Sequence, residues 1–289
     1  FHTRQWVPPA DPQGRAPVRP IYYAWNDKIK LARLPLRYFA NGHTAFVQRI
    51  YAKPDHPPPF ALHMTYQYGD SSAFAYGKRQ RMREARVWWV DPPSYFNEGR
   101  YLAVAPEAAA LPIDWMPSDC TTEQAANRFN LEDAHLRETL RDALGLAIAL
   151  NRTLVMPRML CYCDNIWKEM KHCRVGGAFD MTLPFDCPAD HIIPLAKWFE
   201  SDFPEGFSFR EPGFLSDPRL SDDIRSSWVR VDMQPASAEQ ARAALAPYES
   251  ARVLEFAGTK RRFCGFESGP WRRRFRELAA AVVPDSRHL

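Results

Sequence analysis

The chain is predicted to have an α/β fold, because a long amphipathic helix is followed directly by a buried strand and then by alternating helix and strand segments. Five apolar residues recur at helical spacing in that helix: Leu136, Leu140, Leu144, Ala147 and Ile148. Only Asn151 and Arg152 separate the predicted helix from the apolar run 153–157. A link this short between a helix and a buried strand is typical of a doubly wound unit.

The first part of the chain is predicted to contain short elements. Residues 1–20 are rich in proline and polar residues and are expected to form a disordered leader. Residues 38–48 contain a small-residue turn followed by β-branched and aromatic residues, which predicts a strand or another short element leaving a tight turn, and 60–68 is expected to be a strand. Residues 77–90 are expected to form a short basic helix, which Asp91-Pro92-Pro93 ends, because a residue before proline is pushed out of helical geometry.

The second part is expected to be a separate domain. The stretch 103–117 is rich in alanine and proline without a clear period, so we expect domains over 21–117 and 118–289. Thr121-x-x-Gln124 has the form of a capping box and predicts the start of the long helix. Further segments are predicted as strands over 228–233 and 252–256, a helix over 236–246, and a terminal amphipathic helix over 271–283.

Composition limits the function classes. The chain has 289 residues, 46% of them hydrophobic, which is enough for a sizeable core. A net charge of +4 gives no general attraction to nucleic acid, and the basic clusters lack a recognisable RNA or DNA motif. The sequence contains no apolar run of membrane-spanning length. Because residue 1 is Phe1, we expect a fragment, with any membrane anchor upstream of it.

Six cysteines leave two interpretations open. They are Cys120, Cys161, Cys163, Cys173, Cys187 and Cys264, and four of them fall within one short, loop-rich stretch. This clustering favours disulfides in a secretory lumen, with the connectivity undetermined. The alternative is a zinc site with His172, although Cys161-x-Cys163 lacks the gap usual in zinc knuckles.

The most informative pattern is an imidazole followed by a cluster of cations. His63 precedes five basic residues between Lys78 and Arg86. A nucleotide-sugar diphosphate needs both a metal ligand and Lys or Arg donors, because its negative charge must be neutralised before the sugar leaves. The alternative is a half-buried strand and a solvated basic helix without such a role.

Several segments resemble the plant and algal nucleotide-diphospho-sugar transferases of glycosyltransferase family 77, and their order agrees with its arabinosyltransferase branch. The resemblance extends from about residue 31 to at least residue 191. It is carried by the segments 39–48 (FANGHTAFVQ), 63–68 (HMTYQY), 77–85 (GKRQRMREA), 91–95 (DPPSY), 147–157 (AIALNRTLVMP) and 183–191 (LPFDCPADH). It implies the C-terminal part of a GT-A-like domain over 21–117 that binds a nucleotide sugar and a divalent metal, usually manganese. The Asp-x-Asp metal motif of such domains is absent ahead of these segments, so the isolated chain is expected to carry at most half of the metal site.

The resemblance also implies roles for individual residues. By analogy His63 is a metal ligand, Lys78 binds the donor diphosphate, and Arg79 and Arg81 are further phosphate candidates. The candidates for the sugar or acceptor pocket are Asn41, Gly42, His43 and Gln67. For Asn41 to His43 the alternative is an ordinary tight turn. Glu84 is a further candidate, or it pairs with a neighbouring cation.

The second half resembles the opening of the Rossmann-like domain of protein O-fucosyltransferases, which implies a Rossmann-like region over 118–289. In that setting Arg152 is either a phosphate ligand or a residue that closes the helix C-terminus. Asp190-His191 has the composition of an acid/base pair but is interpreted as structural, because adjacent residues in a proline-flanked loop seldom converge.

The sequence therefore predicts a fragment of a retaining, metal-dependent glycosyltransferase. It is expected to move a pentose, arabinose in the first instance, from a UDP-sugar to a cell-wall glycan or a hydroxyproline-rich glycoprotein. The expected location is the Golgi lumen, as a type II membrane protein in full-length form. The alternative is a non-catalytic glycan-binding or scaffold module, because nine tryptophans and eleven tyrosines offer stacking surfaces for sugars.

Overall fold

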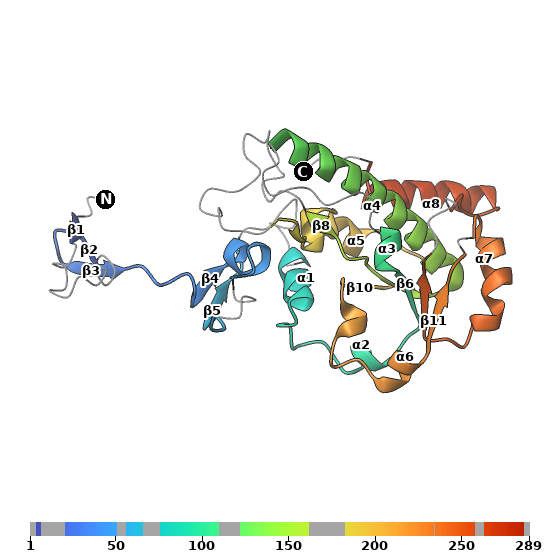
Figure 1. The fold of residues 1–289 in the computed structure, drawn as a ribbon, viewed down its shortest axis with the longest axis horizontal. Coiled ribbons are helices and arrows are strands. Elements are labelled where there is room, and N and C mark those ends of the chain that lie inside the picture. The colour runs from blue at the N-terminus through green and yellow to red at the C-terminus, as the bar shows by residue number, and fades with distance from the viewer. Residues whose placement is uncertain are drawn as a thin grey trace. The chain divides into compact units, whose positions relative to one another are not determined.

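The computed structural model describes residues 4–6, 21–50, 56–65, 76–109, 122–161, 183–233, 235–257 and 263–285, with the backbone alone at 4–6 and 122–133 (Figure 1). The chain divides into two compact units. The first unit consists of residues 1–45 and 49–65, and the second of residues 46–48 and 66–289.

A three-stranded antiparallel sheet begins the first unit. Its strands are β1 (Arg4–Trp6), β2 (Ile21–Ala24) and β3 (Ile29–Ala32), in that order. The turn between β2 and β3 contains Asn26 and Asp27 at positive φ, which these residues tolerate because their short polar side chains can bond locally. β1 lies inside the leader that was expected to be disordered. The structure differs from the prediction there, because backbone pairing with β2 holds three residues without an apolar pattern of their own.

The first unit also contains a pair of parallel strands, β4 (Phe39–Asn41) and β5 (Ala61–His63). β5 lies within the strand predicted over 60–68, whereas β4 comes before the small-residue turn, after which the sequence predicted a strand or another short element. After β4 the chain turns into a π-helix, His43–Val47. Gly42 lies between them against β5, where an added Cβ would meet the backbone oxygen of Thr65 at 1.7 Å. No larger residue fits this approach of two backbone segments.

The second unit is built on a five-stranded, wholly parallel sheet, which confirms the α/β fold class (Figure 1). Its order is β10-β7-β6-β12-β11. The strands are β6 (Tyr101–Val104), β7 (Thr153–Val155), β10 (Phe209–Arg210), β11 (Trp228–Val231) and β12 (Val253–Phe256). β7, β11 and β12 lie where the sequence predicted strands, whereas β6 and β10 were not predicted.

The central strand β6 lies just ahead of the domain junction expected near residue 117. It pairs with β12 on one side and β7 on the other, and both of these strands come after residue 118. The sheet therefore joins residues from both sides of the expected boundary, and the chain passes from one compact unit to the other within residues 45–66. The alanine- and proline-rich stretch 103–117 was expected to mark a domain junction, but its first two residues, with the two before it, form β6 in the core of the second unit.

Helices cover the sheet on one face and shorter elements cover the other. Leu102, Leu154 and Leu254 belong to the larger hydrophobic cluster, together with residues of the long helix α4 (Thr122–Leu150). Their strand neighbours, such as Tyr101, belong to a second cluster with residues of the segment 214–224. This alternation follows from the two-residue period of a strand, and it places hydrophobic side chains on both faces as parallel sheets require.

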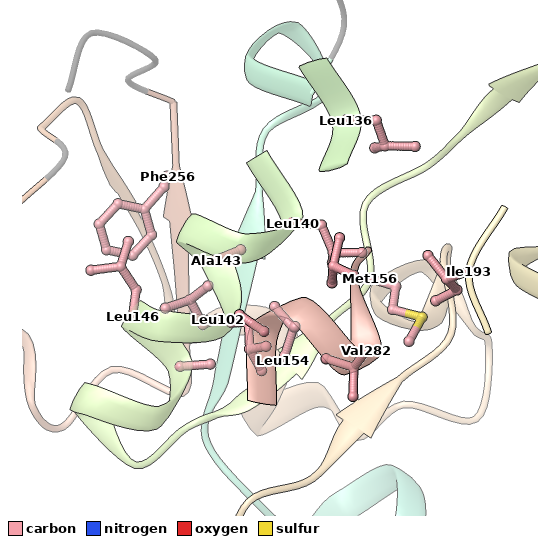
Figure 2. Packing of buried hydrophobic residues seen from close by; sticks show 14 of the residues in the cluster. Leu102, Leu136, Leu140, Ala143, Leu146, Leu154, Met156, Ile193, Phe256 and Val282 are labelled. Atoms are coloured by element: carbon pink, nitrogen blue, oxygen red, sulfur yellow. The ribbon is translucent and has the colours of Figure 1, made fainter. Parts of the chain in front are cut away.

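Helix α4 provides the largest apolar surface. Leu136, Leu140, Leu144 and Ala147 are all buried, as their spacing predicted, and Ile148 packs against the same cluster. Figure 2 shows Leu140, Ala143 and Leu146 close to side chains of the sheet. Burying each such leucine contributes about 1.5–3 kcal/mol. The predicted capping residue Thr121 lies outside the described residues. None of the helices in the described part of the chain is long and apolar enough to cross a membrane.

The other helices are shorter than α4. They are α1 (Tyr76–Glu84), α2 (Ser94–Asn97), α3 (Pro106–Ala109), α5 (Leu195–Glu200), α6 (Asp222–Ser226), α7 (Ala238–Leu245) and α8 (Gly269–Val282), with the 3₁₀ turns η4 (Ala189–His191), η5 (Phe214–Ser216) and η6 (Ala246–Tyr248). α7 and α8 confirm the two helices predicted near the C-terminus. α8 buries Phe275, Ala279 and Val282 and exposes its arginines. α1 ends at Glu84 rather than at Val90, because Arg86 adopts a left-handed φ of 58° that stops a helix.

One disulfide is present among the described residues. It joins Cys161 of β8 (Leu160–Cys161) to Cys187, which follows β9 (Phe185–Asp186), and β8 and β9 pair as antiparallel strands. Cys120, Cys163 and Cys173 lie outside the described residues. The disulfide interpretation of the cysteine cluster is thus confirmed for one pair.

Candidate functional site

Helix α1 carries the predicted diphosphate ligands, and one side of it faces the protein interior. Gly77, Gln80 and Arg81 are buried. The Arg81 Nε donates a hydrogen bond of 2.7 Å to Asp190 Oδ1 in η4, and both side chains are only 1% exposed. The guanidinium of Arg81 is therefore engaged in the interior of the second unit, which favours a structural role over the expected contact with the diphosphate.

A second polar contact joins α1 to η4. The Glu84 carboxylate accepts hydrogen bonds from the backbone N–H of Ala189 at 3.1 Å and from Gln80 Nε2 at 3.1 Å. The carboxylate is enclosed, although Glu84 as a whole residue is only half-buried. Burial, and then the nearby Asp190 carboxylate, raise the pKa of Glu84 to about 8. The hydrogen bonds of Glu84 are thus made with a backbone N–H and an amide rather than with the neighbouring cation that was expected, and they attach α1 to η4.

Arg79 lies on another side of α1 among aromatic rings. Its guanidinium is 4.9 Å from the ring centroid of Phe199 and 5.8 Å from that of Tyr76, and these two rings stack on each other at 4.5 Å. Arg79 has no hydrogen-bond or ion-pair partner among the described residues, and its Nε is buried. Burial, and then the charge of Arg83, lower the pKa of Arg79. Among the described residues, no carboxylate forms an ion pair with it.

Arg83 is committed to a local network. It forms a bidentate pair with Asp91 and lies 4.7 Å from the ring centroid of Tyr95. The Tyr95 hydroxyl donates a hydrogen bond of 2.6 Å to Glu211 Oε2, which follows β10. Burial raises the pKa of the Glu211 carboxyl, although these hydrogen bonds and cations act in the opposite direction. This network fixes the loop after α1 against the end of β10.

Lys78 differs from Arg81 and Arg83 because it is half-buried without an acidic partner among the described residues. Arg86 is also engaged, since its Nη2 donates to the hydroxyl of Ser216 at 2.8 Å. Of the five cations between Lys78 and Arg86, only Lys78 and Arg79 are left without a polar partner in the described part of the chain. They are adjacent in sequence, and together they are the anion-binding candidates of this helix.

In the first unit, two predicted site residues are brought together. Asn41 of β4 and His63 of β5 are partners in the parallel pairing, so they occupy the same register position of the two strands. His63 is exposed. The Asn41 Oδ1 accepts a hydrogen bond of 2.9 Å from the backbone N–H of Thr44, which secures the first turn of the π-helix. His63 and Lys78 belong to different units, and their convergence on one diphosphate stays a prediction.

The other predicted pocket residues have less exposed surface. His43 is 6% exposed, and Gly42 is buried against β5. The tight approach to Thr65 explains the need for glycine at position 42 without a ligand. Gln67 lies outside the described residues. Pocket roles for these positions stay predictions.

The described residues do not by themselves fit a divalent metal site. They contain no group of three His, Cys, Asp or Glu residues that could hold a metal ion. His63 supplies one exposed imidazole, and its register partner Asn41 uses its amide oxygen on Thr44. One imidazole is too few ligands for manganese, which takes several oxygen or nitrogen donors.

The side chains of Arg152 and His191 are buried inside the second unit. Arg152 is 4% exposed and donates to backbone carbonyls, at 2.7 Å to Ala251 and 3.1 Å to Tyr248. Its side chain therefore holds the segment after η6, while its backbone N–H closes its own helix α4, as expected, by donating to the Ala147 carbonyl at 2.9 Å. Burial lowers its pKa to about 10, so it remains charged at neutral pH. His191 is fully buried, edge-on to Phe185 at 5.9 Å.

Sequence reasoning missed Asp91, Tyr95 and Glu211 as partners of the basic helix. A signal existed for Asp91 and Tyr95, since both fall in the segment 91–95 that carries the family resemblance. Glu211 gave no signal, because it lies 116 residues from Tyr95 in a short loop.

Comparison with known proteins gives one relative of known type. The chain is 29% identical to Arabinosyltransferase XEG113 of Arabidopsis thaliana over 291 aligned residues, which cover 91% of this chain and 43% of that protein. The chain thus spans less than half the length of this relative. No family model and no solved structure match it. The similarity confirms the resemblance to the arabinosyltransferase branch that the sequence motifs predicted.

Proposed function

We propose that this chain, an arabinosyltransferase-like glycosyltransferase by its similarity, contributes the donor-diphosphate contacts of an enzyme that transfers a pentose from a UDP-sugar. Arabinose is the proposed sugar, with retention at the anomeric carbon. The proposed acceptor is a hydroxyl of a cell-wall glycan or a hydroxyproline-rich glycoprotein. The observation that supports this most is the pair Lys78 and Arg79, two adjacent cations without an acidic partner among the described residues.

The electrostatics of α1 support binding of an anion. Arg79 is surrounded by the rings of Tyr76 and Phe199 and lies in the field of Arg83, so its charge is disfavoured there. A diphosphate would neutralise this charge and accept hydrogen bonds from donors that the described residues leave unused. In the transfer reaction, the same two cations would offset the charge that develops on the departing diphosphate.

The remaining site residues enter the proposal by analogy. His63 is proposed as one ligand of a divalent ion, manganese in the first instance, which would supply further charge neutralisation when bound. Because the described residues give a single imidazole, no step of the proposal passes through the metal. Asn41, beside His63 in register, and its neighbours Gly42, His43 and Gln67 are proposed to line the sugar or acceptor pocket.

The Golgi lumen is the proposed location, with a membrane anchor in another part of the full-length protein. The disulfide between Cys161 and Cys187 supports an oxidising compartment. Cytosolic proteins are kept reduced, so a structural disulfide is rare in them.

Calorimetry of the purified chain with UDP, with and without Mn²⁺, tests the proposal. Lys78→Ala is expected to weaken UDP binding about 10- to 100-fold, because a charged hydrogen bond is worth about 1.5–3 kcal/mol. Lys197→Ala is the matched control, since Lys197 is an exposed lysine on helix α5. His63→Ala is expected to remove any increase in affinity that Mn²⁺ causes.

The outcomes separate the two interpretations of the sequence. Equal UDP affinity for the unmodified chain, Lys78→Ala and Lys197→Ala would remove the diphosphate site. Binding of a cell-wall oligosaccharide without any binding of UDP would favour the glycan-binding module instead.

A further inference from the structure

We propose that the buried Arg81–Asp190 ion pair is a positioning device, which fixes α1 so that Lys78 and Arg79 face the donor diphosphate. The inference rests on the proposed function for the ligand. In this proposal Arg81 and Asp190 do not touch the substrate and act only by positioning Lys78 and Arg79. The two side chains are 109 residues apart in sequence and belong to two separate elements, α1 and η4.

Helix α1 cannot be held in place by hydrophobic burial alone. Only Tyr76 and Met82 among its nine residues are large and apolar. Its buried side chains are polar, and hydrogen bonds are directional where apolar contacts are not. Arg81 to Asp190, and Glu84 to the N–H of Ala189, attach the helix to η4 at two points one turn apart. Two such points fix both the rotation of α1 about its own axis and its distance from η4.

The element that receives α1 is itself fixed to the core. Cys187, two residues before η4, is joined to Cys161, and its N–H donates to the Met159 carbonyl at 3.0 Å. Just after η4, the carbonyl of Ile192 accepts a hydrogen bond of 2.6 Å from Arg137 Nη2 of α4. η4 is therefore held from both ends, and α1 takes its orientation from a rigid support.

The position of Lys78 follows from this attachment. Gly77, Gln80 and Arg81 are buried against the interior, so the intervening Lys78 and Arg79 are directed to other sides of the helix. A rotation of α1 would carry both cations away from a common ligand. A buried ion pair contributes little net stability compared with an apolar pair of similar size, so its cost is better explained by the orientation that it specifies.

Asp190→Asn tests the inference, with Asp186→Asn as the matched control. Asp186 lies on the same cysteine-linked segment and pairs with Arg158, and the side chains of this pair are 34% and 66% exposed, against 1% for both in the Arg81–Asp190 pair. Asp190→Asn is expected to weaken UDP binding about tenfold, the effect of one charged hydrogen bond. Asp186→Asn is expected to change it less than about twofold. Hydrogen exchange of the backbone amides of α1 is expected to rise in the first variant only.

A double-mutant cycle separates positioning from general destabilisation. If Asp190 acts through α1, the tenfold effect of Asp190→Asn is expected to shrink to about threefold or less in the Lys78→Ala background. A merely structural role gives the full tenfold effect in both backgrounds. If Asp190→Asn does not fold, the pair Arg81→Met with Asp190→Leu removes both buried charges, and the same loss of UDP affinity is expected from a folded protein.

The outcomes distinguish this inference from the proposed function. Unchanged UDP affinity and unchanged α1 exchange in folded Asp190→Asn would overturn the inference, even where Lys78→Ala confirms the diphosphate site. Increased α1 exchange together with UDP binding that ignores Lys78→Ala would overturn the proposed function and leave only the attachment of the helix. An unmodified chain that does not bind UDP overturns both.

Discussion

Replacing Arg152 by alanine is predicted to destabilise the second unit without a specific effect on nucleotide binding. The guanidinium donates to three backbone carbonyls within 3.2 Å, those of Ala251, Tyr248 and Glu249. It thereby ties the start of β7 to the segment between α7 and β12. The phosphate role considered for this arginine requires these donors to be available to a ligand, and they are already in use.

The loss of unfolding free energy in Arg152→Ala depends on which of the three carbonyls can form a hydrogen bond to water once the guanidinium is gone. Each hydrogen bond from a charged donor is worth about 1.5–3 kcal/mol, and a buried acceptor left unsatisfied costs about 1–3 kcal/mol. Tyr248 and Glu249 are exposed residues, so water replaces much of their loss, whereas Ala251 is 7% exposed. Alanine also removes the cost of burying the charge, the same cost that lowers the pKa of Arg152 to about 10. We therefore expect a loss of about 2–4 kcal/mol, a large part of the 5–15 kcal/mol of an ordinary domain.

Urea denaturation followed by tryptophan fluorescence measures this loss as a lower midpoint. Arg100→Ala is the control: Arg100 also donates to the Glu249 carbonyl, at 3.2 Å, but its side chain is 36% exposed. It is expected to change the free energy of unfolding by less than about 0.5 kcal/mol. The reasoning fails if Arg152→Ala keeps its midpoint and instead weakens UDP binding, because that result would assign the guanidinium to a phosphate.

Three further predictions concern single features. Reducing the Cys161–Cys187 disulfide, or replacing Cys187 by serine, is expected to lower the free energy of unfolding by about 3 kcal/mol, since the bond closes a loop of sequence separation 26; an unchanged urea midpoint with reductant would contradict this. Glu84→Gln is expected to gain melting temperature relative to the unmodified chain between pH 5 and pH 8. Burial raises the folded-state pKa of Glu84 to about 8, so stability is lost as the pH rises through this window and the neutral variant avoids the loss; parallel melting curves at both pH values would argue against it. Gly42→Ala is expected to destabilise the β4–β5 pair by about 1–3 kcal/mol, because its Cβ would overlap the Thr65 oxygen; this is measurable as faster proteolysis within residues 39–65, and wild-type resistance would count against the close approach.

The sequence predicted the parts of the fold that are long and regular. Helix α4 could be predicted from the spacing of Leu136, Leu140 and Leu144, because a helix of this length repeats its apolar spacing several times. β6 and β10 have four and two residues, too few to show a period, and β10 reads Phe-Arg. Their place in the sheet is set by pairing with β7, a contact between residues about 50 positions apart that no local pattern records.

The roles of the candidate site residues likewise depend on contacts between distant parts of the sequence. Lys78, Arg79, Arg81 and Arg83 are equivalent in the sequence as cations of one basic helix. The fold separates them by the partner that each one meets: Arg81 meets Asp190 and Arg83 meets Asp91, while the other two meet no acidic group in the described part of the chain. The partner of Arg81 comes from a loop more than 100 residues away, so the charge pattern of α1 could not reveal which cations are free to bind a phosphate. If Lys78 binds the diphosphate and Arg81 only positions α1, neutralising Arg81 is expected to weaken UDP binding only by changing the orientation of Lys78. The ligand-binding cations of a basic helix such as α1 can therefore be identified only once the acidic side chains that the fold places beside it are known, because those side chains decide which positive charges remain available to a ligand.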